Sequence, residues 1–196
     1  EIQAGLYRTG TFTSGAPVCA DIYCFAKGLG GGLTKIGATS VLKNKYLLKF
    51  GLLHTSTFAE DSISSGIALK VLDILTRSNS FIQRSMNVAR YLKSKLKRLH
   101  EKYPNIIKEV RGRGLMLAVE FWEDIQYASY EFKLFGSINA IGYLFSSYLL
   151  HIKGLRTFST LSNQFAIRIE PSLYMKIAEV DYLVEAIASI VLKIEK

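Results

Sequence analysis

Residues 25–38 read FAKGLGGGLTKIGA, and this stretch decides how the rest of the sequence is interpreted. Lys27 ends an apolar run, and four of the five residues after it are glycine. The phosphate-loop pattern G-x-x-x-x-G-K-[ST] is not met, because the lysine comes before the glycines. Two interpretations stay open. The lysine is either a surface residue in a flexible loop or a nucleophilic amine at the carboxyl end of a strand, where α/β proteins place their ligand crevice.

Around this loop, hydrophobic periodicity predicts a mixture of strands and helices, which indicates an α/β or α+β protein. Strands are expected within 18–26, 36–42, 106–121 and 154–171, and helices over 61–76, 80–104, 137–152 and 177–194. Residues 134–152 contain no Asp, Glu, Lys or Arg. Their bulky apolar residues nevertheless follow helical spacing on one side, which favours a helix packed on a protein core over a membrane span.

Composition limits the class of protein. The 196 residues are 49% hydrophobic and carry a net charge of +9, so the chain can build a core and is not disordered. Much of the positive charge lies in residues 80–104, whose only acidic residue is Glu101. The basic residues of this segment are Arg84, Arg90, Lys93, Lys95, Lys97, Arg98 and Lys102. We interpret it as the solvated face of one amphipathic helix, because no nucleic-acid motif accompanies it.

The two cysteines are predicted to be buried thiols of a reducing compartment. If 17–26 is a strand, Cys19 and Cys24 lie roughly 16 Å apart on opposite faces, too far for a disulfide. The three histidines lack the spacing of metal ligands, so no metal site is predicted.

Five segments, in order, resemble the class III aminotransferases. They are EIQAGLYRTG (1–10), ADIYCFAKGLGGG (20–32), HTSTFAED (54–61), IIKEVRGRGLMLAVEF (106–121) and GLRTFSTLSNQFAIRIEPSL (154–173). These are pyridoxal 5'-phosphate (PLP) enzymes of fold type I, and they include ornithine, acetylornithine, 4-aminobutyrate and putrescine aminotransferases. The resemblance implies an α/β fragment: the end of the large mixed-sheet PLP domain (1–79), a linking helix (80–104) and the α+β small carboxyl-terminal domain (105–196).

The resemblance also implies roles for four residues. Lys27 matches the lysine that holds PLP as a Schiff base and moves the substrate proton as general base and then acid. Gln3 matches the glutamine near the phenolic oxygen of PLP. Thr57 matches the threonine that contacts the PLP phosphate from the neighbouring subunit, which implies a homodimer with its site at the interface. Arg168 matches an arginine that pairs with the substrate carboxylate in several members.

For two of these residues a structural alternative stays open. Thr57 is four residues before Asp61, so it is also a candidate cap for the helix over 61–76, although Asp61 or Ser62 suits that role better. Arg168 is also explained as an ordinary surface arginine on a strand.

Some positions depart from the family pattern. The aspartate that holds the pyridine nitrogen protonated is expected immediately before Glu1, and the first half of the family's chain is not in this sequence. Ala59 and Glu60 replace the usual glycines after Thr57 and Phe58, where the added carboxylate is expected to disturb the phosphate region.

We therefore expect the carboxyl-terminal half of a cytoplasmic class III aminotransferase. It would move an amino group from an amino donor to a 2-oxo acid or aldehyde, with neither nucleic acid nor membrane as a partner. The alternative is a truncated or degenerate, catalytically inactive relative that serves as a structural or interaction module.

Overall fold

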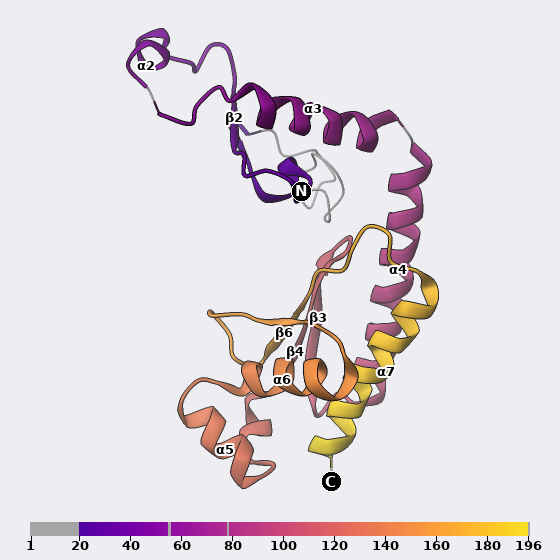
Figure 1. Ribbon diagram of the computed structural model, residues 1–196. Coiled ribbons are helices and arrows are strands. Elements are labelled where there is room, and N and C mark those ends of the chain that lie inside the picture. Colours follow the sequence, from indigo (N-terminus) through magenta and orange to yellow (C-terminus); the bar gives the residue numbers. More distant parts are fainter. Residues whose placement is uncertain (1–19, 55, 78, 196) are drawn as a thin grey trace. The chain divides into compact units, whose positions relative to one another are not determined.

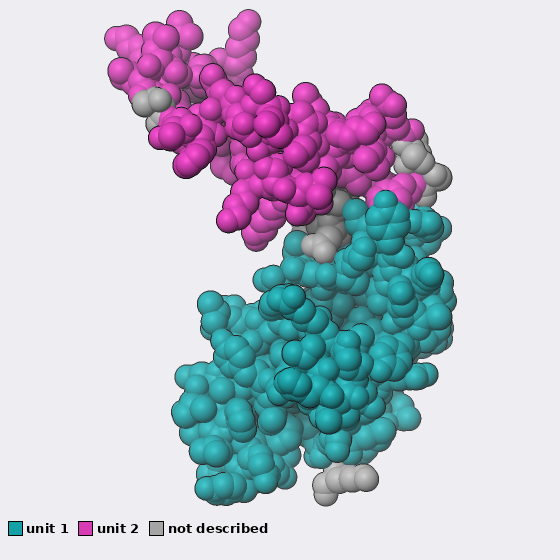
Figure 2. Space-filling view, in the orientation of Figure 1, with its two compact units in different colours: residues 1, 3–6, 83–196 teal, residues 2, 7–82 magenta. Residues whose placement is uncertain are grey.

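The computed structural model describes residues 20–54, 56–77 and 79–195, and the chain divides into two compact units. Unit 2 ends at Ile82 and unit 1 begins at Gln83, within the helix α4 (Asn79–Lys102). Figure 2 colours the two units separately. The three-part division at 1–79, 80–104 and 105–196 stays a prediction.

Unit 2 carries the glycine loop between two short strands. Its described elements are β1 (Ile22–Phe25), the 3₁₀ helix η1 (Lys27–Gly30), β2 (Ala38–Val41), α2 (Leu48–Leu53) and α3 (Ser62–Arg77). The two strands pair antiparallel, with Ile22 opposite Val41 and Phe25 opposite Ala38. The loop that joins them therefore begins and ends at the same edge of the strand pair, and Lys27 lies at its start.

Unit 1 is built on a four-stranded antiparallel sheet (Figure 1). Its strands are β3 (Ile107–Arg113), β4 (Met116–Phe121), β5 (Phe158–Ser159) and β6 (Ala166–Ile169), in the order β3-β4-β6-β5. The helices after β4 are η2 (Glu123–Tyr127), α5 (Tyr130–Ser137), α6 (Ile141–Lys153) and α7 (Ile177–Ile194). In the β3–β4 hairpin Arg113 pairs with Met116, as the tight turn around Gly112 and Gly114 predicts.

The two faces of this sheet differ in chemistry because successive side chains alternate between them. One face contributes Val110, Leu117, Val119, Ile167 and Ile169 to the main core, which is completed by apolar residues of α4, α6 and α7. The other face carries charged side chains, among them Glu109, Arg111, Glu120 and Arg168. α4 and α7 lie side by side, joined by a hydrogen bond of 2.8 Å from the Tyr91 hydroxyl to Asp181 Oδ1.

The predicted helix over 137–152 is in fact two helices. α5 ends at Ser137 and α6 begins at Ile141. Between them Asn139 adopts a left-handed backbone with a φ of 56°, which a continuous helix does not accommodate. In the part of the chain that the structure describes, no helix is both long enough and apolar enough to span a membrane.

The prediction of buried thiols is wrong for Cys24. It is an exposed free cysteine at the third position of β1, and its Sγ lies 3.9 Å from Thr39 Oγ1 on the neighbouring strand. Ile22 and Cys24 are exposed whereas Tyr23 and Phe25 are half-buried, so Cys24 lies on the solvent side of β1. Cys19 lies outside the described residues.

Candidate functional site

Lys27 stands two residues after the end of β1 and opens the 3₁₀ helix η1. The turn is closed by a backbone hydrogen bond of 3.2 Å from Leu29 N–H to Ala26 C=O. Lys27 itself has a φ of 54°, in the left-handed region that non-glycine residues rarely occupy. Such a conformation costs on the order of 1–2 kcal/mol and is commonest at functional sites.

The amine of Lys27 is accessible. Its residue is exposed, and among the described residues the side chain forms no ion pair or hydrogen bond. The amine is therefore accessible to a ligand at the end of the strand. The nucleophilic interpretation also requires a partly desolvated amine, so the role of Lys27 stays a prediction.

Two of the glycines after Lys27 differ in why glycine is needed there. Gly31 has a φ of 63°, and a Cβ there would lie 2.7 Å from Val71 Cγ2 of α3. Glycine at this position thus allows the loop to pack against α3. Gly32 has a φ of 79°, but a Cβ there would meet nothing within 4 Å. A side-chain hydrogen bond of 2.6 Å between Thr34 and Ser64 ties the end of the loop to the same helix.

Thr57 lies in the turn before α3, and its side chain is exposed. It does not cap this helix, because Asp61 Oδ2 accepts the backbone N–H of Ser64 at 2.8 Å. The Ser64 side chain and backbone hydrogen bonds hold the pKa of Asp61 below its usual range. The helix-cap alternative for Thr57 is therefore wrong, because Asp61 caps α3 in its place.

The turn after Thr57 is strained at the position where the family pattern has glycine. Glu60 has a φ of 61°, which a glycine adopts at little cost. Phe58, Glu60 and Asp61 line a cavity of about 540 Å³ together with Lys35, which follows the glycine loop. Within unit 2, the glycine-loop segment and the turn that carries Thr57 thus share one cavity.

Arg168 of β6 is held by Glu170, which lies one residue beyond the end of that strand. Its Nε lies 3.0 Å from Glu170 Oε1, and its Nη2 lies 3.1 Å from Glu170 Oε2. Both oxygens of the carboxylate meet the guanidinium, which is the geometry in which this pairing is strongest. Arg168 is therefore not an unpaired surface arginine, and its fork already contains a carboxylate.

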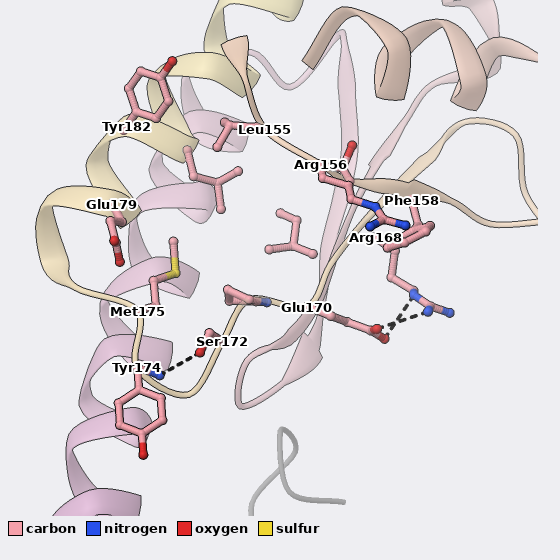
Figure 3. Close-up of a pocket in the computed structure, with 14 residues that line it drawn as sticks. Leu155, Arg156, Phe158, Arg168, Glu170, Ser172, Tyr174, Met175, Glu179 and Tyr182 are labelled. Atoms are coloured by element: carbon pink, nitrogen blue, oxygen red, sulfur yellow. Dashed lines mark hydrogen bonds and ion pairs between the residues drawn. The ribbon is translucent and has the colours of Figure 1, made fainter. Parts of the chain in front are cut away.

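The same pair borders a cavity of about 530 Å³ in unit 1 (Figure 3). The segment that forms one wall begins where α6 ends: Gly154 has a φ of 65°, and Leu155 N–H donates to Leu149 C=O at 2.8 Å. This turn directs the chain into β5. Arg156, Phe158 and Arg168 then lie along one side of the cavity, and side chains of α7 form the opposite side.

Sequence reasoning did not single out Glu170 and Arg156. Residues two apart on a strand share a face, so Arg168 and Glu170 were recognisable as a pair of opposite charges from the sequence alone. Arg156 follows the end of α6, which the sequence predicted to within one residue, at 152 against Lys153, but no motif drew attention to this arginine. Gln3, the fourth predicted site residue, lies outside the described residues.

Comparison with known proteins decides the family. The sequence profile of the family described as Aminotransferase class-III matches residues 1–191. The chain belongs to the class III aminotransferases. The segments that resemble this family are thus part of a match over almost the whole chain, as predicted.

Solved structures similar to this class III aminotransferase chain are transaminases. An (S)-enantioselective omega-transaminase from Thermomicrobium roseum has a TM-score of 0.73 and 26% identity, over 98% of this chain and 42% of that one. The ornithine aminotransferase from Toxoplasma gondii has a TM-score of 0.72 and 25% identity, over 100% of this chain and 42% of that one. The ornithine aminotransferase from Plasmodium yoelii has a TM-score of 0.68 and 22% identity, over 91% of this chain and 41% of that one. At this identity the likeness shows the fold alone.

These matches confirm the predicted fold class, a mixed α/β fragment of the fold type I transaminases. The chain spans about two fifths of the length of the solved transaminases that it matches. The roles of individual residues rest on their positions in this chain and are proposals.

Proposed function

We propose that this chain is the Lys27-bearing portion of a PLP-dependent class III aminotransferase. The observation that carries the proposal is the place of Lys27, at the carboxyl end of β1 with a left-handed backbone and an exposed, unpartnered amine. A lysine amine is the group that forms a Schiff base with an aldehyde, and that of Lys27 is accessible to one. The reaction proposed is transfer of an amino group from an amino donor to a 2-oxo acid or aldehyde.

We propose that residues of unit 2 hold the cofactor. Lys27 would hold its aldehyde carbon, and Gly32 leaves open space next to the loop. PLP supplies an electron sink that stabilises negative charge on the substrate carbon. Once a substrate amine has displaced Lys27 from PLP, the free Lys27 amine would take the proton from the substrate carbon. It would later return this proton, because the lysine is tethered beside that carbon.

Thr57 and Gln3 are proposed to position the cofactor. The Thr57 hydroxyl is exposed and, since Asp61 caps α3, free to donate to a phosphate. In the proposed homodimer it serves the phosphate of the neighbouring subunit. Unit 2 supports such an assembly by its unburied apolar residues: Leu48, Phe50, Leu52 and Leu53 of α2 are all exposed. We propose the cytoplasm as its location, because Cys24 is a free, exposed thiol.

Arg168 is proposed to receive the substrate carboxylate. Its planar fork is suited to that task, as its side-on contact with Glu170 demonstrates. A substrate carboxylate can take the Nε–Nη2 side of the guanidinium only when Glu170 leaves it. Glu170 would therefore set how readily a carboxylate-bearing substrate binds.

The test is chemical trapping of PLP on the 196-residue chain. PLP is added, the imine is reduced with borohydride, and the modified lysine is located by peptide mapping. We expect the label on Lys27 in wild type and its loss in Lys27→Ala. Lys43→Ala is the matched control, because Lys43 is an exposed lysine beyond β2.

Two results would contradict the proposal. One is a label spread over several lysines with no preference for Lys27. The other is a wild-type chain whose label on Lys27 is unaffected by an added amino donor, since a donor must displace the lysine for transfer to occur. The second result would favour the inactive, structural relative.

A further inference from the structure

A buried hydroxyl of α4 binds the backbone of a distant loop. Ser85, in the second turn of α4, is 4% exposed, and its hydroxyl donates a hydrogen bond of 3.0 Å to the Leu173 C=O. The two residues are 88 positions apart in the sequence, and both belong to unit 1. None of the roles proposed for the candidate site uses this hydroxyl, so its position needs another explanation.

Leu173 belongs to the loop that joins β6 to α7, and Glu170 opens this loop. On the side of the strand, Ile169 is the last residue of β6 in register with β4, opposite Leu117. On the side of the helix, Lys176 is the N-cap of α7. Glu170 lies beyond the register of β4 and β6, so the position of its backbone depends on how the loop is held.

The loop contains a stiff turn next to Glu170. The Met175 backbone N–H donates to the Ser172 C=O at 3.0 Å, and the Tyr174 backbone N–H donates to the Ser172 hydroxyl at 3.2 Å. Pro171 fixes its own φ and restricts the backbone of Glu170 before it. Figure 3 shows Glu170, Ser172 and Tyr174 along this one stretch of chain. A shift of the turn is therefore passed on to Glu170.

Adjacent side chains of α4 contact this turn. Ser85 donates to the Leu173 C=O, and the Cζ of Arg84 lies 5.8 Å from the centre of the Tyr174 ring. Because Tyr174 is 65% exposed, its contact with the guanidinium is a weak constraint. The hydrogen bond of Ser85 is made by a buried donor, so its loss would change the turn more.

We propose that Ser85 is a positioning residue for the ion pair of Arg168 and Glu170. The side-on pair needs both oxygens of Glu170 in place, at 3.0 Å from Nε and 3.1 Å from Nη2 of Arg168. By fixing Leu173, Ser85 fixes Glu170, and Glu170 limits access to the guanidinium. The inference rests on the proposal that Arg168 receives the substrate carboxylate, but the first of its two tests does not.

The first test observes the pair through the side-chain Nε–H resonance of Arg168, in a proton–nitrogen NMR spectrum of the full 196-residue chain. Arg168→Gln identifies the resonance, and Glu170→Gln gives its position without the carboxylate. We expect Ser85→Ala to move the resonance part of the way toward that position. Ser85→Thr keeps the hydroxyl and should restore the wild-type position.

Ser94→Ala is the matched control for this test. Ser94 is an exposed serine of α4, and its hydroxyl donates to the Tyr91 C=O of the same helix at 2.8 Å. Its removal takes a hydroxyl from α4 without touching the loop after β6. The Arg168 resonance should therefore stay at its wild-type position.

The second test measures the affinity for acetate by NMR titration. Ser85→Ala should bind acetate about twofold more tightly than wild type, below the limit of about fivefold that loss of the whole pair allows. In a chain that already carries Glu170→Gln, Ser85→Ala should have no further effect, because Ser85 acts through Glu170. A purely structural role of Ser85 would lower the free energy of unfolding and move neither the resonance nor the affinity.

Two results would contradict the positioning role. One is an Arg168 resonance that Ser85→Ala leaves unmoved in a folded chain. The other is an equal gain in acetate affinity with and without the Glu170 carboxylate, since Ser85 would then act on Arg168 by another route. A resonance that moves while no variant binds acetate more tightly would support the positioning role and contradict the proposed role of Arg168 in substrate binding.

Discussion

Arg168 of β6 and Glu170, one residue beyond this strand, form a side-on ion pair, with Nε–Oε1 at 3.0 Å and Nη2–Oε2 at 3.1 Å. The pair is partly exposed, since the side chains retain 46% and 26% of their accessible surface. An ion pair of this exposure is worth at most about 1 kcal/mol. Glu170 thus occupies the fork of Arg168 without holding it firmly, and a competing carboxylate can displace it at small cost.

Replacing Glu170 with Gln should release Arg168 with little change in stability. We expect the free energy of unfolding to change by less than about 1 kcal/mol. Acetate, a simple carboxylate probe, should bind up to about fivefold more tightly, because the guanidinium of Arg168 is released. Urea unfolding and an NMR titration with acetate measure the two effects.

Glu185→Gln is the control for this change, because Glu185 is an exposed carboxylate of α7 outside the cavity. It removes the same charge and should alter neither quantity. If Glu170→Gln binds acetate no better than Glu185→Gln does, Glu170 does not limit carboxylate binding at Arg168.

The left-handed backbone of Lys27 predicts an unusual order of stabilities. Alanine at this position keeps the strained φ of 54°, whereas glycine adopts it freely. Lys27→Gly should therefore be more stable to urea than Lys27→Ala by about 1 kcal/mol, although glycine usually destabilises. Both variants lack the amine and should lose PLP labelling equally. The same pair of substitutions at Lys43 should give the opposite order.

The sequence predicted correctly those elements that are determined by residues close together in the chain. The stripe of Val180, Leu183, Ile187 and Ile190 is buried in the core, and α7 has the predicted bounds, 177–194. The β3–β4 hairpin follows from Gly112, whose φ is 118° and where a Cβ would meet the backbone of Met116. In both cases the determining residues are neighbours in the sequence.

The break between α5 and α6 has a distant cause, which periodicity does not contain. Gln164 Nε2 donates to Asn139 Oδ1 at 3.1 Å, and its Oε1 accepts the Ile141 backbone N–H at 3.3 Å. A side chain from the β5–β6 turn thus satisfies the polar groups that the break exposes. The same contact fixes where α6 begins, whereas its end at Lys153 lies within one residue of the prediction.

For the site itself, motif spacing identified Lys27, Thr57 and Arg168 as candidates, but it did not predict their environments. The left-handed φ of Lys27 depends on how the turn packs against α3, and the pairing of Arg168 depends on the rotamer of Glu170. Both are properties of the folded backbone. The motif therefore predicts which residue types are present, but not whether their side chains are free to bind a ligand.

Glu60 offers a test of the departure from the family's glycines. Glu60→Gly should be more stable than Glu60→Ala by about 1 kcal/mol, because only glycine relieves the φ of 61°. If the carboxylate also disturbs a bound phosphate, both variants should label with PLP at lower concentration than wild type does. Glu101→Ala, an exposed carboxylate of α4, is the control for loss of charge. Equal stability of the two Glu60 variants would mean that the turn carries no strain.

Acid should weaken unit 1 through Glu120, which is 7% exposed on the charged face of the sheet. Burial raises the pKa of Glu120, but the hydrogen bonds from Lys108, at 2.9 Å, and from Arg111 outweigh it and hold the pKa below its usual range. A carboxyl whose pKa is lowered on folding stabilises the protein above its unfolded-state pKa of about 4.3, and this contribution is lost as the pH falls through the folded value.

Glu120→Gln should therefore cost about 1–2 kcal/mol of unfolding free energy at neutral pH, because Lys108 and Arg111 lose a charged partner. The difference from wild type should shrink as the pH is lowered below about 4, where wild-type Glu120 is itself protonated. Urea unfolding at a series of pH values measures it, with Glu101→Gln as the control that leaves the profile unchanged. A difference that stays constant from neutral to acid pH would assign the loss to packing instead of to the ion pairs.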